Sequence, residues 1–589
     1  MNLRQLSHIN ELNPQLFREI KGRLTRRNLA LSIGLSLLGQ LFVYFLSIGR
    51  ETGLHFIRLS SEYCNDKALY LQYQQQYEQI SNQLYSPAAG SPPIINREAL
   101  EVKLSEISQL MNSNCPSDAI NVSLWWRDYW TEVFMVLSVF GFFALIVVGT
   151  YMLINDLATE QRRGTLNFIR LSPQTYKGIF VGKIFGVPSL LYLTILLMVP
   201  YHLWLGVSSG LPILEILGFY GIVIASCAFF YSFALLFGLM TGGLSGFQSW
   251  LGSGAVLSFL LIANNKPIYQ DGADWLNLFS PSFLLRYLVN KTDSSYLSYP
   301  FNHEGIQDLQ WFELPLGISG TLILCFSLFH LGLWTFWLWK GLERRYQNPN
   351  STLFSKRQSY WITGCFTVAN LGFTLQRFQL NGDYIGIGLF WNLLLFLILI
   401  AALSPQRQTL QDWARYRRER VNGKAHLLSD LIEGERSPAV VAIGLNLLIV
   451  IILFGLTTIW VASPDERLGI FAAVLLNASL IWICASLAQL ILLMKTPKRT
   501  FWAAGTVGVV LILPVTISAV FGLKTSQEAY AFLFSPLSFI AIEQTTSPVI
   551  LLAIASQVMM TILFNLRLSK QLKKAGESTS KALLTGHSS

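Results

Sequence analysis

Strongly apolar runs, each long enough for a helix to cross the ~30 Å hydrocarbon core of a bilayer, recur along the whole chain. Only 13% of the residues are charged, whereas soluble domains carry about a quarter. A β-barrel would instead show shorter segments of alternating hydropathy. The sequence therefore predicts an all-α, polytopic membrane bundle of about twelve spans. The spans are expected at residues 29–49, 128–154, 184–204, 213–239, 248–262, 313–339, 359–376, 385–403, 438–461, 468–494, 500–522 and 549–566.

The basic residues predict how the chain is oriented. Most of the 43 Lys and Arg residues fall into alternate connections between the spans. Connections rich in Lys and Arg stay in the cytoplasm. We therefore expect a multi-pass protein of the plasma (inner) membrane with both termini cytoplasmic. The net charge of +10 is expected to favour contact with membrane lipids. Because the basic residues are spread over several short loops, a nucleic acid is not an expected partner.

Short recurring strings indicate a division into two halves. The string LFSP occurs at Leu278–Pro281 and again at Leu533–Pro536, each time before a membrane span. The dipeptides Ser-Pro and Asn-Pro also recur before corresponding spans. The pattern favours duplicated units of six spans each, related in parallel. The halves are expected at 29–340 and 341–566, followed by a polar cytosolic tail at 567–589.

The first outer connection, residues 50–127, contains two apolar stripes at helical spacing, separated by a stretch rich in Pro and Gly. It is expected to form a helical hairpin that stands off the membrane. Cys64 and Cys115 bracket it and are disulfide candidates, because the outer compartment is oxidising. Two unrelated thiols are the alternative.

The inner loop 155–183 carries several helix-breaking and capping signals. Gly164 is expected to break the helix that continues from the second span. Thr165 is expected to cap a short helix, Leu166–Leu171, whose apolar side chains include Phe168.

Further along the same loop, Ser172 followed by Pro173 is a second cap signal. Lys177 and Lys183 are expected to lie at the lipid headgroups. The residues alone predict a short helix that is held at both ends. They also fit a plain capped turn with basic anchors.

The segment 1–28 predicts an amphipathic helix. Asn13 is a cap signal and Pro14 suits the first helical position. Phe17 belongs to an apolar face and Glu19 to the opposite, charged face. This arrangement is typical of a helix that lies in the membrane interface.

The loop 155–183 resembles the inner loop of type-2 ABC exporter permeases. The resemblance rests on Glu160, on Gly164-Thr165-Leu166, on Leu171-Ser172-Pro173 and on Gly182-Lys183. It implies that the short helix is a coupling helix that docks on a nucleotide-binding subunit. The implied coupling residues are Glu160, Gly164, Thr165, Leu166, Phe168 and Pro173. The implied connecting helix carries Asn13, Pro14, Phe17 and Glu19.

The second inner loop, 404–437, departs from that pattern because it lacks Gly-Thr-Leu. Leu427, Leu428, Leu431 and Ile432 still make one apolar face. We therefore expect a degenerate coupling element that does not contact the ATPase in the same way.

The expected function is that of the membrane-spanning permease subunit of an ATP-driven exporter whose substrate the sequence does not name. One chain with two halves is expected to bind two copies of a separate ABC ATPase, which uses ATP and Mg²⁺. The chain itself has no phosphate-binding loop, so no enzyme activity and no cofactor are expected. Its seven scattered His residues predict no metal site.

Two other classes of protein remain open. An ATP-independent secondary transporter would need an ionisable residue in mid-membrane, for which His330 is the candidate. A membrane-embedded lipid or glycan transferase would need acidic residues in an outer loop, where Asp271 and Asp274 lie beside Trp275.

Overall fold

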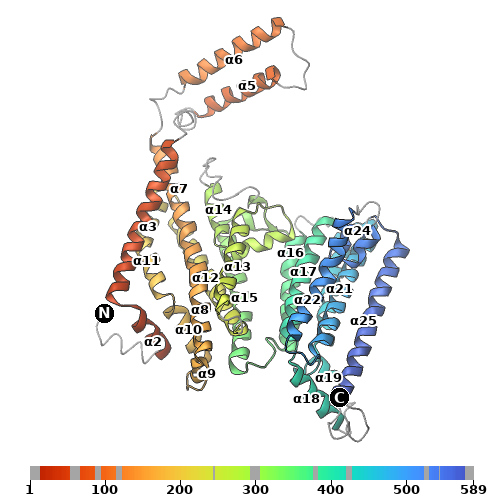
Figure 1. Ribbon diagram of the computed structural model, residues 1–589. Helices are drawn as coiled ribbons and strands as arrows, with labels where there is room; N and C mark the ends of the chain where they lie inside the picture. Colours follow the sequence, from red (N-terminus) through yellow and green to blue (C-terminus); the bar gives the residue numbers. More distant parts are fainter. Residues whose placement is uncertain are drawn as a thin grey trace.

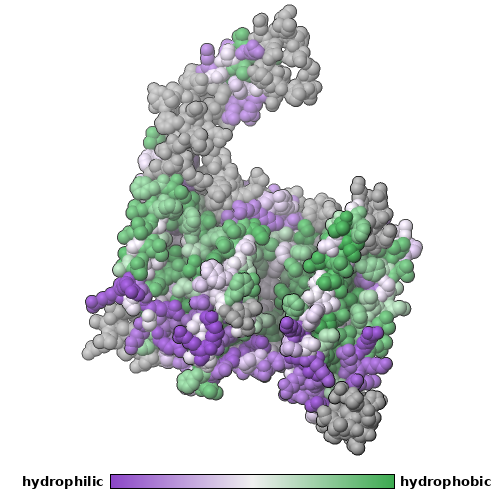
Figure 2. All heavy atoms as spheres, viewed as in Figure 1, coloured by the Kyte–Doolittle hydropathy of each residue, from purple (hydrophilic) through white to green (hydrophobic). Residues whose placement is uncertain are grey.

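The protein is a bundle of long helices (Figure 1). The computed structural model describes residues 13–53, 67–85, 94–114, 122–242, 246–291, 306–375, 382–419, 427–522, 529–542 and 544–576. Within these residues, 11 helices are long and apolar enough to cross a membrane. Hydrophobic residues form a broad band across the bundle, and hydrophilic residues line its lower end (Figure 2). The chain is thus an all-α polytopic membrane bundle.

The first group of helices, drawn red to green in Figure 1, includes six of the eleven candidate spans. Its elements are α2 (Pro14–Arg23), α3 (Arg26–Gly53), α7 (Val122–Phe143), η1 (Ala144–Val148), α8 (Gly149–Arg162), α9 (Thr165–Arg170), α10 (Tyr176–Gly186), α11 (Ser189–Ser208), α12 (Ile213–Met240), α13 (Phe247–Asn265), η2 (Gly272–Phe279), α14 (Ser282–Lys291), η3 (Ile306–Asp308), η4 (Leu316–Ile318) and α15 (Gly320–Gln347). Strands β1 (Gln310–Trp311) and β2 (Leu314–Pro315) pair antiparallel, with Trp311 opposite Leu314.

The second group, drawn green to blue, includes the other five candidate spans. Its elements are α16 (Lys356–Thr374), α17 (Gly382–Leu403), α18 (Arg407–Glu419), α19 (Leu427–Ile432), α20 (Val440–Val461), α21 (Pro464–Leu492), α22 (Arg499–Val520), η6 (Ala529–Phe534), α24 (Ser538–Ile542) and α25 (Ser547–Ala575). Helices α5 (Lys67–Tyr85) and α6 (Ile94–Asn114) pack on each other, away from both groups (Figure 1).

Each group is built around one central helix. In the first group, α12 packs against α8 and α15, and in the second α21 packs against α17 and α25. The π-helical segment η1 lies beside α12, and the buried Tyr231 hydroxyl donates to the Leu145 carbonyl at 2.6 Å. A Cβ on Gly149 would lie only 2.2 Å from that hydroxyl oxygen. A small residue at this position therefore lets α8 approach α12 closely.

The two LFSP strings have the same local structure. Each begins in a 3-10 helix, η2 or η6, and ends just before a short α-helix, α14 or α24. The Ser280 amide donates to the Asn277 carbonyl at 3.1 Å, and the Ser535 amide to the Phe532 carbonyl at 3.0 Å. Each buried serine hydroxyl then accepts from the amide two residues later, at 3.3 Å and 3.1 Å.

The two groups meet where η2 and β1 pack on α16. The Phe312 amide donates to the Gly372 carbonyl at 2.7 Å, and the Trp311 indole N–H to the Ala369 carbonyl at 3.3 Å. A Cβ on Gly372 would lie 2.0 Å from the indole nitrogen of Trp311. The absence of a side chain at Gly372 therefore makes room for Trp311.

Several predicted bounds are wrong. The span expected at 359–376 is present as helix α16, but it is not among the 11. This helix carries polar side chains that form hydrogen bonds inside the bundle. For example, the Thr363 hydroxyl donates to the Asn446 side-chain oxygen at 2.8 Å. The span expected from residue 313 begins at Gly320, because residues 310–315 form the hairpin β1–β2. The tail expected from residue 567 is helical as far as Ala575.

Candidate functional site

A helix predicted within segment 1–28 is present as α2, and its N-terminus forms as expected. Asn13 is the N-cap, its side-chain oxygen accepts from the Leu16 amide at 3.0 Å, and Pro14 occupies the first turn. The amide group of Asn13 also donates to the Gly178 carbonyl at 2.7 Å. One capping residue thereby begins α2 and fixes it to the start of α10.

The face of α2 that packs on the protein is polar. Gln15 and Glu19 are its buried residues, whereas Phe17 and Ile20 are only partly covered. Glu19 therefore does not lie on an outward-facing charged surface, as the sequence suggested. Its burial is possible because Gln15 donates to it at 2.9 Å and Arg23 pairs with it at 3.1 Å.

The helix break at Gly164 is confirmed. Gly164 has φ +71°, which only glycine adopts at little cost, and no atom lies within 4 Å of the position that a Cβ would take. Thr165 does not cap α9, because it is the first residue of that helix. Its hydroxyl instead donates to the Glu160 carbonyl at 3.2 Å, near the end of α8. Thr165 therefore joins the two helices across the break.

The short helix α9 has two distinct apolar faces. Leu166 is 3% exposed and Ile169 is 7% exposed, so both point into the bundle. Phe168 is 79% exposed and Leu171 is 85% exposed. Figure 2 shows a small hydrophobic tip on the hydrophilic lower end, in the place of α9 in Figure 1. The apolar side chains predicted for this short helix are therefore divided between internal packing and an exposed pair.

The second predicted cap is wrong. Ser172 and Pro173 lie in a turn, and α10 begins at Tyr176. Thr175 is the actual N-cap, with its hydroxyl accepting from the Gly178 amide at 3.2 Å. Ser172 instead donates to the Ile169 carbonyl at 2.7 Å, which satisfies an acceptor near the end of α9.

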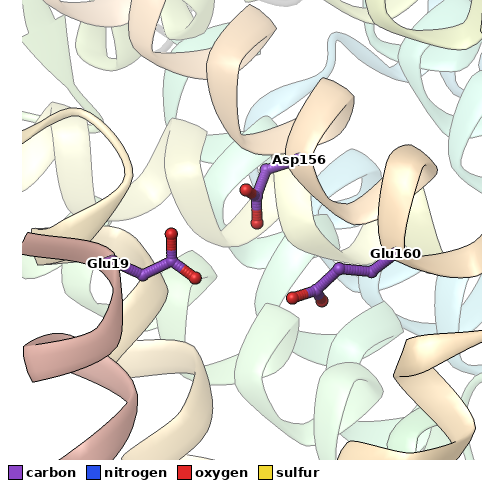
Figure 3. Close-up of side chains that lie close together, drawn as sticks. All are labelled: Glu19, Asp156 and Glu160. Atoms are coloured by element: carbon purple, nitrogen blue, oxygen red, sulfur yellow. The ribbon is translucent and has the colours of Figure 1, made fainter. Parts of the chain in front are cut away.

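Three carboxylates from two helices converge beside this turn. Glu19 on α2 faces Asp156 and Glu160 on α8 (Figure 3). The ammonium of Lys183 on α10 lies 2.6 Å from Asp156 and 2.8 Å from Glu160. It is also 4.0 Å from Glu19. One lysine thus links all three helices.

Two arginines complete the charge balance. Arg18 pairs with Glu160 at 2.6 Å and Arg23 pairs with Asp156 at 2.8 Å, and both also reach Glu19. We call these six residues the ion-pair cluster: Arg18, Glu19, Arg23, Asp156, Glu160 and Lys183. Its three negative and three positive side chains balance, which makes a partly buried group of charges tolerable.

Lys183 does not lie at the lipid headgroups, because its side chain is 1% exposed. Three close carboxylates could also suit a metal ion, and their oxygens lie within 4.8 Å of one another. The Lys183 ammonium already occupies the cation position, in direct contact with two of the three. A metal ion would therefore have to displace a paired lysine.

Glycines bring α2 and α10 together. A Cβ on Gly182 would lie 2.9 Å from the Asn13 side-chain oxygen, and one on Gly186 would lie 2.5 Å from the Glu19 Cβ. The two glycines are four residues apart, so they share one face of α10. This close approach allows Lys183 to reach carboxylates on both α2 and α8.

The second inner loop has a different structure. In α19, Leu428 is 71% exposed and no residue is buried. The ammonium of Lys356, at the start of α16, donates to the carbonyls of Leu431 and Pro438 and to Ser437. Burial lowers the pKa of Lys356 to about 8. Two separate ion pairs also hold this loop, Arg344–Glu435 at 2.8 Å and Arg357–Glu433 at 2.6 Å, in place of the shared cluster of the first loop.

The sequence pattern identified part of this site. Glu160, Gly164, Leu166 and Asn13 all occupy the junction. Asp156 was missed, although it lies four residues before Glu160 and hence on the same face of a helix. Cys64 and Cys115 lie outside the described residues. Comparison with family models, with curated proteins and with solved structures found no match.

Proposed function

We propose that the chain is the membrane permease subunit of an ATP-driven exporter of the type-2 ABC class. In this proposal a separate ATPase subunit docks on α9 from the cytoplasm. The observation that carries the proposal is the exposure of Phe168 and Leu171 on a short, firmly held helix at the hydrophilic end of the bundle. A water-exposed apolar pair of this kind is typical of a contact with another protein.

The contacts around α9 are suited to transmitting a force. Thr165 joins α9 to the backbone at Glu160, and the Glu160 carboxylate contacts both Arg18 on α2 and Lys183 on α10. Arg170 also lies over the ring of Tyr346 on α15, at 5.6 Å. A displacement of α9 would therefore act on four helices at once, including two that end candidate spans, Val122–Arg162 and Gly320–Gln347.

We further propose that the two helix groups are duplicated halves of one pathway. The equivalent packing of α12 and α21, together with the equivalent LFSP turns, supports this. The proposed orientation has both termini in the cytoplasm, with α5 and α6 as an outer hairpin. One chain would then enclose the pathway for an exported substrate and bind two ATPase subunits, with α9 and α19 as unequal docking sites.

The alternatives find less support in the geometry. His330 accepts from the Trp334 indole at 2.9 Å and packs among aromatic rings, which is an ordinary packing role. Asp274 pairs with Lys266 at 2.6 Å and forms a capping box with Asp271. These carboxylates are used to shape η2. We therefore favour neither a secondary transporter nor a transferase.

The test is ATPase stimulation in a reconstituted complex of the chain and its ATPase subunit. We expect the double variant Phe168→Ala/Leu171→Ala to lose at least about tenfold in stimulation, because hot-spot apolar contacts are each worth about 1–2 kcal/mol or more. For comparison, Leu428→Ala alters α19, the weaker of the two proposed docking sites, and should cost less stimulation than the α9 variant. An ATPase whose activity does not respond to the α9 variant would overturn the proposal.

A further inference from the structure

A groove of about 650 Å³ lies in the second helix group, between α18, α19, α20 and α25. In Figure 1 it belongs to the lower end of the bundle, where α18 and α19 are labelled. Its lining is largely apolar and includes Leu431, Val441, Leu568 and Leu572. On α25 the neighbouring Leu563 and Leu566 are exposed, so the same helix also presents an apolar outer surface.

The polar end of the groove carries positive charge. Arg417 on α18 and Lys573 on α25 both line it, and the Arg417 guanidinium lies 5.3 Å from the centre of the Trp413 ring. Lys573 forms no ion pair with any described residue. The indole N–H of Trp413 is buried and has no acceptor within the described chain. The groove therefore offers hydrogen-bond donors at one end and an apolar floor beyond them.

We propose that this groove binds one anionic phospholipid of the adjoining leaflet. The phosphate contacts Arg417 and Lys573, and an oxygen of the headgroup or ester accepts from the Trp413 indole. The acyl chains follow Val441 and Leu568 toward the exposed leucines of α25. A free phosphate ion would leave the apolar floor empty, and a zwitterionic lipid would gain less from two cations.

A second groove has acidic instead of basic residues, and the comparison supports an anionic lipid as the occupant of the first groove. This second groove has about 730 Å³, is lined by α21, α24 and α25, and carries Asp465 and Glu466. These residues begin α21, whereas Lys573 lies near the end of α25. Of the two apolar grooves, only the one with Arg417 and Lys573 matches a negative headgroup.

The proposal is independent of any ATPase. The purified full-length chain is exposed to equal amounts of phosphatidylglycerol and phosphatidylcholine with the same acyl chains, and retained lipid is counted by native mass spectrometry. The unaltered chain should retain one molecule of phosphatidylglycerol in preference to phosphatidylcholine. Arg417→Gln/Lys573→Gln should lower that preference about thirtyfold, as expected for two basic residues near an anionic headgroup.

Two controls separate a built site from general attraction. Arg415→Gln/Lys570→Gln removes the same charge from exposed positions on the same two helices, outside the groove lining. It should change the preference by less than about twofold, since neither side chain lines the groove and so neither contacts the bound headgroup. Val441→Trp fills the floor and should lower retention of both lipids. The proposal would be overturned if the two double charge variants lost the same amount of lipid preference, or if the unaltered chain showed no preference. Unchanged lipid retention in Val441→Trp would also overturn it.

Discussion

Lys183 is the residue on which the junction depends most. Its ammonium is almost fully buried and contacts two carboxylates of α8, while the main chain around it packs on α2. Removing one partner of a buried ion pair leaves an uncompensated charge and costs about 3–5 kcal/mol. The ion-pair cluster therefore makes the position of α2 depend on one side chain of α10.

Replacement of Lys183 tests this dependence. Lys183→Met should lower the free energy of unfolding by about 3–5 kcal/mol, measured by SDS titration of the purified protein. Lys177→Met, at an exposed position of the same helix, should change it by less than about 0.5 kcal/mol. Lys183→Met/Asp156→Asn should recover part of the loss because one unpaired charge is removed. Equal stabilities of the two single variants would contradict this role.

Gly164 is expected to be needed for its backbone conformation alone. The space around its Cβ position is empty, so a substitution is penalised only through φ +71°. Asn tolerates this conformation, whereas a β-branched residue does not. Gly164→Asn should preserve ATPase stimulation, and Gly164→Val should lose most of it while inserting normally. Equal stimulation by the two variants would show that the left-handed break is not required.

Lys356 is expected to make the stability of the folded protein depend on pH. Burial lowers its pKa to about 8 in the folded state, from about 10.5 in the unfolded chain. Between these values the unfolded chain binds more protons, so stability should rise as the pH increases. Lys356→Met should remove this part of the rise. Melting curves from pH 7 to pH 10 would measure it, and parallel profiles for the two proteins would contradict the assignment.

At the scale of elements, local signals were predictable and distant contacts were not. Asn13 and Gly164 could be identified because caps and breaks depend on residues within a few positions. The partner of Lys183 on α8 is 27 residues away, and nothing in the spacing relates the two. The cap at Thr175 was missed because Ser172-Pro173 is the stronger local signal, although the chain forms a turn there.

The close packing of α2 on α10 leads to a prediction for Gly186. Gly186→Val would place a side chain where the Glu19 Cβ already lies, at 2.5 Å, so α2 should be displaced. Trypsin should then cleave within α2 at least about tenfold faster, because cleavage tracks the open population. Gly34→Val in α3 meets no atom within 4 Å and is the control. Unchanged cleavage of the Gly186 variant would show that α2 is held elsewhere.

For the whole molecule, hydropathy predicted most of the architecture because the bilayer requires long apolar helices. Helix α16 was predicted as a span and is present, but it is less apolar than the 11 candidate spans, and its polar side chains pair with Asn446 and other groups inside the bundle. The LFSP repeat correctly indicated a recurring local structure, because the buried serine in each copy, Ser280 or Ser535, forms the same turn. The shape of the η2 and β1 contact between the groups could not be predicted, since it depends on Trp311 fitting against Gly372.

The proposed account makes this chain a complete pathway in one copy. Two helix groups in one chain would leave no need for a second permease, and two inner loops would offer two docking places for ATPases. The mass of the complex, purified intact from its own membrane and measured by native mass spectrometry, tests this most directly. We predict one copy of this chain with two copies of an ATP-binding subunit. A chain that is purified without any such subunit, or a complex with two copies of this chain, would contradict the account.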